Sequence, residues 1–165
     1  MKFKSEDVAL TAVFAAFYAA GVVFLTPISF EVFQLRVADA LLPLAVVFGL
    51  PVALGTSFGC FIANFYGGLG LVDVVGGAFA NFVACVLAWR IGEKTVLRRF
   101  TSCLAETAVV TLVVGSYLSV LLNVPIEISL LGIFLGSIVA INILGFGLLE
   151  ALYRSGVAKR FVERG

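Results

Sequence analysis

The chain has 165 residues, of which 62% are hydrophobic and 13% are charged, and its formal net charge is +1. A soluble domain carries about 25% charged residues, so this composition excludes a soluble fold and indicates that lipid solvates much of the surface. The near-zero net charge argues against a nucleic-acid partner. The chain has no histidine, and its three cysteines are scattered, so we expect neither a metal site nor a cofactor.

Apolar runs along the chain predict an all-α integral membrane protein with six transmembrane helices in one transmembrane domain. Five runs are clear, whereas residues 37–66 are too long for one comfortable pass and short for two. Gly49 and Pro51 interrupt that stretch and favour a break there. The six helices are predicted at 8–25, 37–49, 52–66, 71–89, 104–122 and 128–152.

The distribution of basic residues supports the even number of passes. Lysine and arginine gather at the N-terminus, in an expected loop at 90–99 and at the C-terminus. Loops that stay in the cytoplasm carry such an excess, so all three clusters are expected on that side. The first two clusters must then be separated by an even number of helices, which the break at Gly49 and Pro51 provides. Both termini are therefore predicted to be cytoplasmic. The clusters are Lys2 and Lys4; Arg90, Lys94, Arg98 and Arg99; and Arg154, Lys159, Arg160 and Arg164.

Small residues recur at every fourth position in four of the predicted helices. Such stripes let helix backbones approach closely in lipid, and the stripe Gly55, Gly59 and Ala63 is expected to pack inside the bundle. The first helix differs, because other alanines widen the small-residue face that it presents. That face could instead contact another membrane subunit. Its central residues are Ala12, Ala16 and Ala20.

Polar residues concentrate in the predicted outward half of the bundle. The helix dipole stabilises carboxylates at the start of a helix, and buried amides often join helices by hydrogen bonds. Each of these residues therefore also has a structural interpretation. With nearby aromatic side chains they suit a flat polar heterocycle. Glu106 and Glu150 lie beside basic clusters and are expected to be solvated. The candidate polar residues are Gln34, Arg36, Asp39, Asn64, Asp73, Asn81, Glu127 and Asn142, and the aromatic ones are Phe30, Phe33, Phe65 and Tyr66.

Catalytic patterns are missing from the sequence. No nucleophile and base can be paired within these residues, so we do not expect an enzyme. The phosphate-binding pattern GxxxxGK[ST] does not occur either, so the chain is not expected to hydrolyse ATP itself.

Two segments carry a family resemblance. Residues 27–41 read PISFEVFQLRVADAL, which resembles the PISF…Q(F/L)RV(S/A)(E/D)AL segment of the QueT family of queuosine-precursor transporters. Residues 59–64 read GCFIAN and residues 70–77 read GLVDVVGG, similar to the GCFIAN…GLGLxDVVxG pattern of that family. The resemblance covers roughly residues 8–90.

The resemblance implies the substrate-binding (S) component of an energy-coupling-factor (ECF) importer in a prokaryotic plasma membrane. Its partners would be a transmembrane coupling protein, docked on the alanine face of the first helix, and two ATPase subunits. The implied substrate is a 7-deazaguanine such as preQ0, preQ1 or queuine. One of three carboxylates would accept the guanine-like edge, with Arg36 orienting a carboxylate and amides adding hydrogen bonds. The carboxylates are Asp39, Asp73 and Glu127, and the amides are Gln34, Asn64 and Asn81.

The second half of the chain departs from the family pattern. Where a Gly-Glu pair is expected in the last helix, the sequence reads Gly136-Ser137, and the loop at 123–127 is short. The residues leave open an S component for another vitamin or nucleobase. They also leave open a solitary membrane facilitator or channel, although no helix carries a continuous polar stripe. A membrane enzyme or a structural subunit fits the composition less well.

Overall fold

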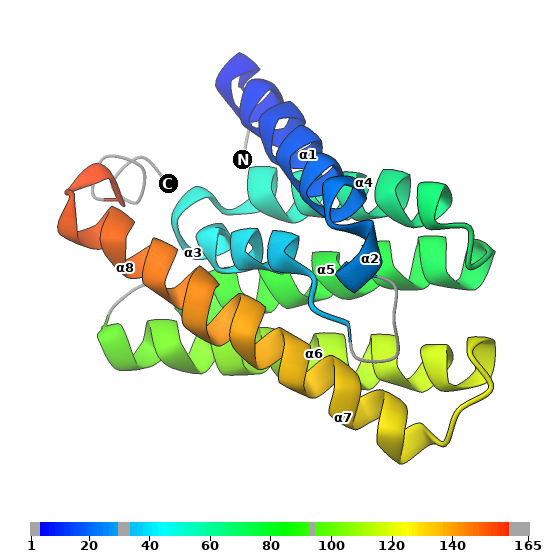
Figure 1. Cartoon of the computed structure of the whole chain (residues 1–165). Helices are drawn as coiled ribbons and strands as arrows, with labels where there is room; N and C mark the ends of the chain where they lie inside the picture. The colour runs from blue at the N-terminus through cyan, green and yellow to red at the C-terminus, as the bar shows by residue number, and fades with distance from the viewer. Residues whose placement is uncertain (1–3, 30–33, 93–94, 159–165) are drawn as a thin grey trace.

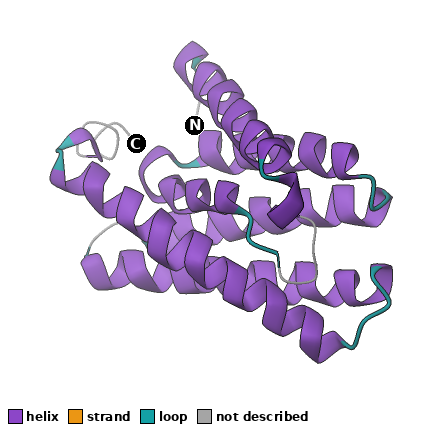
Figure 2. Ribbon diagram, viewed as in Figure 1, coloured by secondary structure: helices purple, strands orange, loops and turns teal. Residues whose placement is uncertain are grey.

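The computed structural model describes residues 4–29, 34–92 and 95–158. Within these ranges the chain is helical, and no strand is present (Figure 2). Eight of the described elements are α-helices, two of them only four residues long, and two have other helical geometry: η1 is a 3₁₀-helix and η2 a π-helix. In chain order the elements are α1 (Ser5–Phe24), α2 (Thr26–Ser29), η1 (Val37–Leu44), α3 (Ala45–Phe48), α4 (Leu50–Gly67), α5 (Leu71–Ile91), α6 (Val96–Leu121), α7 (Ile126–Ser137), η2 (Ile138–Gly145) and α8 (Phe146–Arg154).

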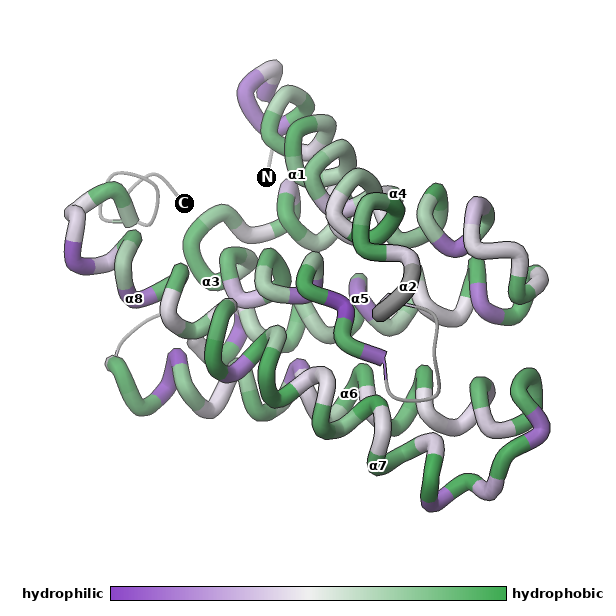
Figure 3. Tube along the Cα trace, viewed as in Figure 1, coloured by the Kyte–Doolittle hydropathy of each residue, from purple (hydrophilic) through white to green (hydrophobic). Residues whose placement is uncertain are grey.

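Five described helical rods are long and apolar enough to cross a bilayer. They are α1, α4, α5, α6 and the continuous rod Ile126–Arg154, which joins α7, η2 and α8. The sixth apolar rod, Val37–Phe48, is shorter and joins η1 to α3. Each predicted helix therefore corresponds to one observed rod. In Figure 3 the hydrophilic colour gathers at the helix ends and in the segment that leads into η1.

The short rod formed by η1 and α3 occupies the centre of the bundle. η1 contacts α1, α4, α5, α6, η2 and α8, and most of its side chains are buried. Pro43 lies inside η1 and cannot donate a backbone hydrogen bond, which suits a short 3₁₀ segment. Because protein rather than lipid surrounds this rod, it needs neither the length nor the regularity of a full transmembrane helix.

The break between α3 and α4 lies where the sequence predicts it. Gly49 has φ 63° and ψ −133°, a conformation that favours glycine. A Cβ at Gly49 would also lie 3.1 Å from the indole ring of Trp89. Pro51 then falls in the first turn of α4, where its missing N–H is not needed.

Helix α6 begins at Val96, eight residues earlier than the sequence predicted, so the expected loop at 90–99 is too long. Thr95 caps the helix by accepting a hydrogen bond from the backbone N–H of Arg98 at 3.2 Å. Arg99 then turns inward and forms two hydrogen bonds with Glu150 of α8, at 2.5 and 3.1 Å. The prediction that Glu150 is simply solvated is wrong, because its carboxylate joins two helices.

Helix α1 packs on α4 through small residues. A Cβ at Gly55 would lie 2.7 Å from Phe14 Cβ, and one at Gly59 would lie 2.6 Å from the carbonyl oxygen of Ala15. Glycines at both positions therefore allow the two backbones to touch, as the spacing of small residues indicated. The opposite face of α1 stays open: Ala12 and Ala16 are exposed and Ala20 is half-buried.

Helix ends fall into two groups in Figure 1. The end of α5, the start of α6 and the end of α8 lie at one end of the bundle, and the turns after α4 and α6 lie at the other. The first end carries Arg90, Arg98, Arg99 and Arg154. The remaining members of the basic clusters apart from Lys4 are outside the described residues, and the cytoplasmic placement of the termini stays a prediction.

Candidate functional site

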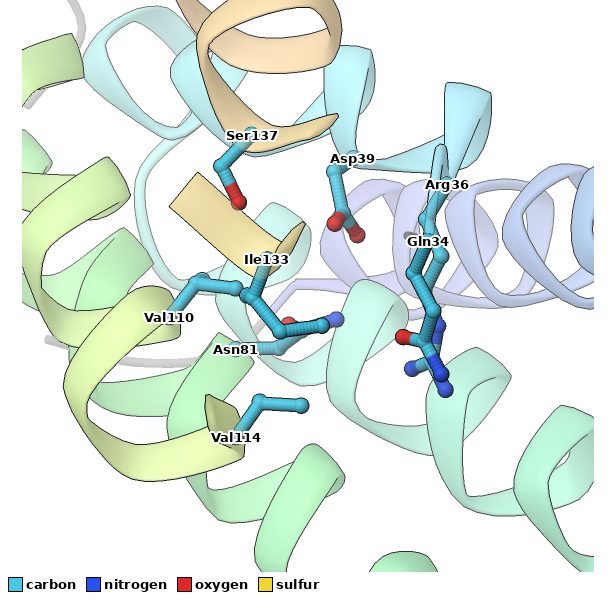
Figure 4. Close-up of a pocket in the computed structure, with 8 residues that line it drawn as sticks. All are labelled: Gln34, Arg36, Asp39, Asn81, Val110, Val114, Ile133 and Ser137. Atoms are coloured by element: carbon cyan, nitrogen blue, oxygen red, sulfur yellow. The ribbon is translucent and has the colours of Figure 1, made fainter. Parts of the chain in front are cut away.

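Polar side chains converge on a small cavity in the middle of the bundle (Figure 4). Its walls come from the segment before η1, from η1 itself and from α5, α6 and α7. The interior space is about that of one water molecule. The cavity is lined by Gln34, Arg36, Asp39, Asn81, Val110, Val114, Ile133 and Ser137.

Gly136 brings the segment before η1 to the cavity. A Cβ at this position would lie 1.7 Å from the carbonyl oxygen of Gln34, so any other residue would push the segment away from α7. This close approach places Gln34 and Arg36 against α5 and α7. Ser137 follows directly and lines the cavity.

Asp39 is the carboxylate that borders the cavity. It lies in the first turn of η1 and is 4% exposed. Its side chain does not cap the helix; instead Oδ1 accepts a hydrogen bond from the hydroxyl of Tyr18 on α1, at 2.5 Å. Figure 4 shows the carboxyl group directed toward the space between η1, α5 and α7.

Arg36 ties the segment before η1 to α2, α4 and α5. Its Nε donates to the carbonyl oxygen of Ser29 at 3.3 Å, and its Nη1 lies 3.7 Å from the sulfur of Cys60. Its Nη2 pairs with Asp73 Oδ1 at 3.9 Å, and the same oxygen accepts from the Tyr117 hydroxyl at 2.9 Å. Arg36 thus faces the cavity on one side and a fully buried carboxylate on the other.

The three predicted amides have different surroundings. Asn64 donates to the backbone carbonyl of Asp73 at 2.8 Å and supports the start of α5 without lining the cavity. Asn81 and Gln34 both line the cavity, and their amide nitrogens are buried with no hydrogen-bond partner among the described residues. Asn142, by contrast, donates to Thr107 at 2.6 Å and joins η2 to α6.

The expected aromatic wall is not part of the described cavity. Phe65 and Tyr66, in the last turn of α4, are 72% and 66% exposed. Phe30 and Phe33 lie outside the described residues. Glu127, the third carboxylate candidate, is exposed in the first turn of α7 and does not line the cavity.

Glu106 is the second carboxylate whose prediction is wrong. It was expected to be solvated, but its side chain is fully buried and neither oxygen has a hydrogen-bond partner among the described residues. The reason is the early start of α6, which moves Glu106 from the helix end to its interior.

Several contributing residues were not predicted. Tyr18 and Tyr117 each hold a carboxylate, while Val110, Val114, Ile133 and Ser137 complete the cavity wall. A tyrosine within an apolar helix was the available signal for the first two, since its hydroxyl needs a partner when buried. The valines carry no signal in the sequence, because apolar residues at that spacing occur throughout a membrane helix.

The arrangement suits binding rather than chemistry. It combines one carboxylate acceptor, two unpartnered amide donors and a serine hydroxyl around apolar side chains, as ligand sites do. Comparisons with curated proteins and with solved structures gave no significant match. The family model described as QueT transporter matches residues 8–154, which is most of the chain. The chain therefore belongs to the QueT transporter family and is a multi-pass membrane protein of that family.

Proposed function

We propose that this protein is the S component of an ECF importer that captures a 7-deazaguanine queuosine precursor in a prokaryotic plasma membrane. The observation that carries the proposal is the central cavity, where Asp39 and two unpartnered amides meet inside a chain of the QueT transporter family. Uptake would use ATP hydrolysed by partner subunits.

Asp39 is the proposed acceptor for the guanine-like edge of the ligand. That edge presents adjacent N–H donors, which one carboxylate accepts in bidentate fashion. Each carboxylate oxygen has two lone-pair sites, so the hydrogen bond from Tyr18 to Oδ1 leaves room for the ligand. Tyr18 also fixes the rotamer of Asp39. The amide groups of Asn81 and Gln34 would donate to the carbonyl and ring nitrogen of the base.

The cavity must widen to admit the ligand, since a bicyclic base is several times larger than a water molecule. The segment of residues 34–36 is the wall that we propose to move, because it is extended rather than helical and rests on Gly136. Arg36 would guide this motion through its pair with Asp73, which lies behind the cavity wall. Asn64 would support Asp73 from α4, and Glu127 has no direct role in this arrangement.

The outward face of α1 is the proposed contact for the coupling protein. Ala12 and Ala16 are exposed there, and Ala20 adjoins them. Small side chains permit a close helix–helix approach in lipid, where apolar area alone gives no preference for protein over lipid. The buried side of the same helix carries Tyr18, so α1 joins the proposed docking face to the ligand carboxylate.

The test is a titration of the purified protein with preQ0, preQ1, queuine and guanine while thermal unfolding is followed. A ligand that binds only the folded state adds about 2.7 kcal/mol of stability at one hundred times its Kd. Stabilisation by a deazaguanine at micromolar concentration would support the proposal. If none of the four stabilises the protein, the substrate is wrong, and a panel of vitamins and other nucleobases becomes the next set of ligands.

A further inference from the structure

Glu106 is the most unusual polar residue in the described bundle. It lies near the middle of α6, and its side chain is fully buried. Both carboxylate oxygens lack a hydrogen-bond partner among the described residues. The ion pairs among the described residues, Arg36–Asp73 and Arg99–Glu150, do not include Glu106.

An unpaired carboxylate at this depth is costly. Removing an ionised group from water is strongly unfavourable unless a partner compensates, and intramembrane acidic residues are characteristically functional. The ionisable side chains near Glu106 are Cys85 on α5, Cys103 on α6 and Asp39 on η1. None of them supplies a positive charge, and Asp39 adds a second negative one.

Glu106 lies on the face of α6 that also carries Val110 of the cavity wall. Val110, which lines the cavity, is one helical turn further along the same face of α6. On α5 the same step separates Asn81, also in the cavity wall, from Cys85. Figure 4 shows Asn81 and Val110 together on the side of the cavity formed by α5 and α6.

We propose that Glu106 pairs with a cationic amine on the ligand, so that the site selects an aminomethyl 7-deazaguanine over its neutral analogues. This inference rests on the proposed function. The aminomethyl group of preQ1 and the secondary amine of queuine are attached on the opposite side of the base from the N–H edge. A base held by Asp39 at that edge would extend its amine toward a second acceptor. A charge-assisted hydrogen bond in a buried site is roughly twice as strong as a neutral one.

A comparison of ligands tests the inference on the unmodified protein. The 7-hydroxymethyl analogue of 7-deazaguanine matches preQ1 in size but carries no charge. We expect preQ1 to bind roughly tenfold or more tightly than this analogue, as measured by the ligand concentration needed for a given thermal shift. Equal affinities would overturn the role of Glu106, while binding of both would leave the proposed function standing.

Glu106→Gln is the matching variant. It keeps the shape of the side chain and removes the charge, so the preference for preQ1 over the hydroxymethyl analogue should disappear while the analogue binds as before. Cys103→Ser, one turn away on the same helix face, is the control and should keep the preference. An unchanged preference in Glu106→Gln would overturn the inference. If neither compound stabilises the unmodified protein, the failure belongs to the proposed function itself. Should Glu106→Gln fail to fold, the ligand comparison on the unmodified protein decides.

Discussion

Two carboxylates inside the bundle differ in what holds them. Asp39 accepts from Tyr18, and Asp73 accepts from Tyr117 and pairs with Arg36. A tyrosine hydroxyl can donate a hydrogen bond to a buried carboxylate while its aromatic ring packs among apolar side chains. Asp39 faces the cavity while Asp73 faces Arg36, so the two residues should respond differently to the same substitution.

Asp39→Asn and Asp73→Asn form a matched pair of variants. Asp39→Asn should weaken ligand binding by roughly tenfold or more, because an amide cannot accept two N–H donors as a carboxylate does. Asp73→Asn should instead lower the free energy of unfolding by about 1–3 kcal/mol, since Arg36 loses its charged partner in a buried setting. Thermal unfolding with and without preQ1 measures both effects.

The contrast between the two variants is the decisive result. An Asp73→Asn protein that keeps its stability and loses the ligand would exchange the two assignments. Equal loss of stability and of affinity in both variants would mean that neither carboxylate contacts the ligand directly.

Residue types and spacing predicted four of the residues that line the cavity but not how they come together, and their role in binding a ligand stays a prediction. Polar side chains are costly to bury in an apolar membrane segment and often mark a functional site. The residues identified in this way are Gln34, Arg36, Asp39 and Asn81. Glu106 was predicted to be solvated because its helix was expected to begin at residue 104, whereas α6 begins at Val96. The partners of the carboxylates are 21 and 44 residues away in the chain, a separation that local patterns do not encode.

At the scale of elements, the length of each apolar run predicted a helical rod, but it did not predict which rods contain 3₁₀ or π segments. The 3₁₀ character of η1 and the π-helix of η2 depend on their mutual packing, in which Pro43 and the backbone at Ala40 lie against Gly145. The early start of α6 depends on a cap at Thr95, where the run of charged residues suggested a loop. Charge patterns alone do not distinguish a loop from a solvated first turn.

The contact between α1 and α4 gives a prediction at this scale. Gly55→Ala and Gly59→Ala should each lower the free energy of unfolding by about 1–3 kcal/mol, because the new methyl group meets backbone and Cβ atoms of α1 at 2.6–2.7 Å. Chemical or thermal unfolding in detergent measures the loss. Gly147→Ala in α8 is the control, since a Cβ there meets nothing within 4 Å. It should be neutral or stabilising by up to about 1 kcal/mol, as alanine favours helix. Unaltered stability in both α4 variants would show that α1 shifts freely on α4.

At the scale of the whole molecule, α1 stands apart from the other long helices. Of an 18-residue apolar stretch of α1, only 17% is buried inside the bundle, whereas 39–50% of the corresponding stretch is buried in each of the other four long rods. It contacts mainly α4 and η1, and Figure 1 shows it at the edge of the bundle. Lipid would satisfy this exposed apolar face equally well, so a partner is favoured only by the small residues on it. Assembly and ligand binding should therefore be separable.

Substitution of the alanine face tests that separation. Ala12→Leu and Ala16→Leu should reduce co-purification of the coupling protein and ATPase subunits several-fold, because each added side chain prevents a close helix–helix approach. The thermal shift produced by preQ1 should stay within error of the unmodified protein, since both residues point away from the cavity. Ala108→Leu places the same side chain on the exposed face of α6 and should leave assembly intact. If Ala108→Leu disrupts assembly and the α1 variants do not, the docking face lies on α6.

If the unmodified protein binds preQ1 but recovers no partner from its own host, it acts as a solitary facilitator. The capture site and the mode of energy supply would then need separate explanations, because only the first depends on Asp39 and its surroundings.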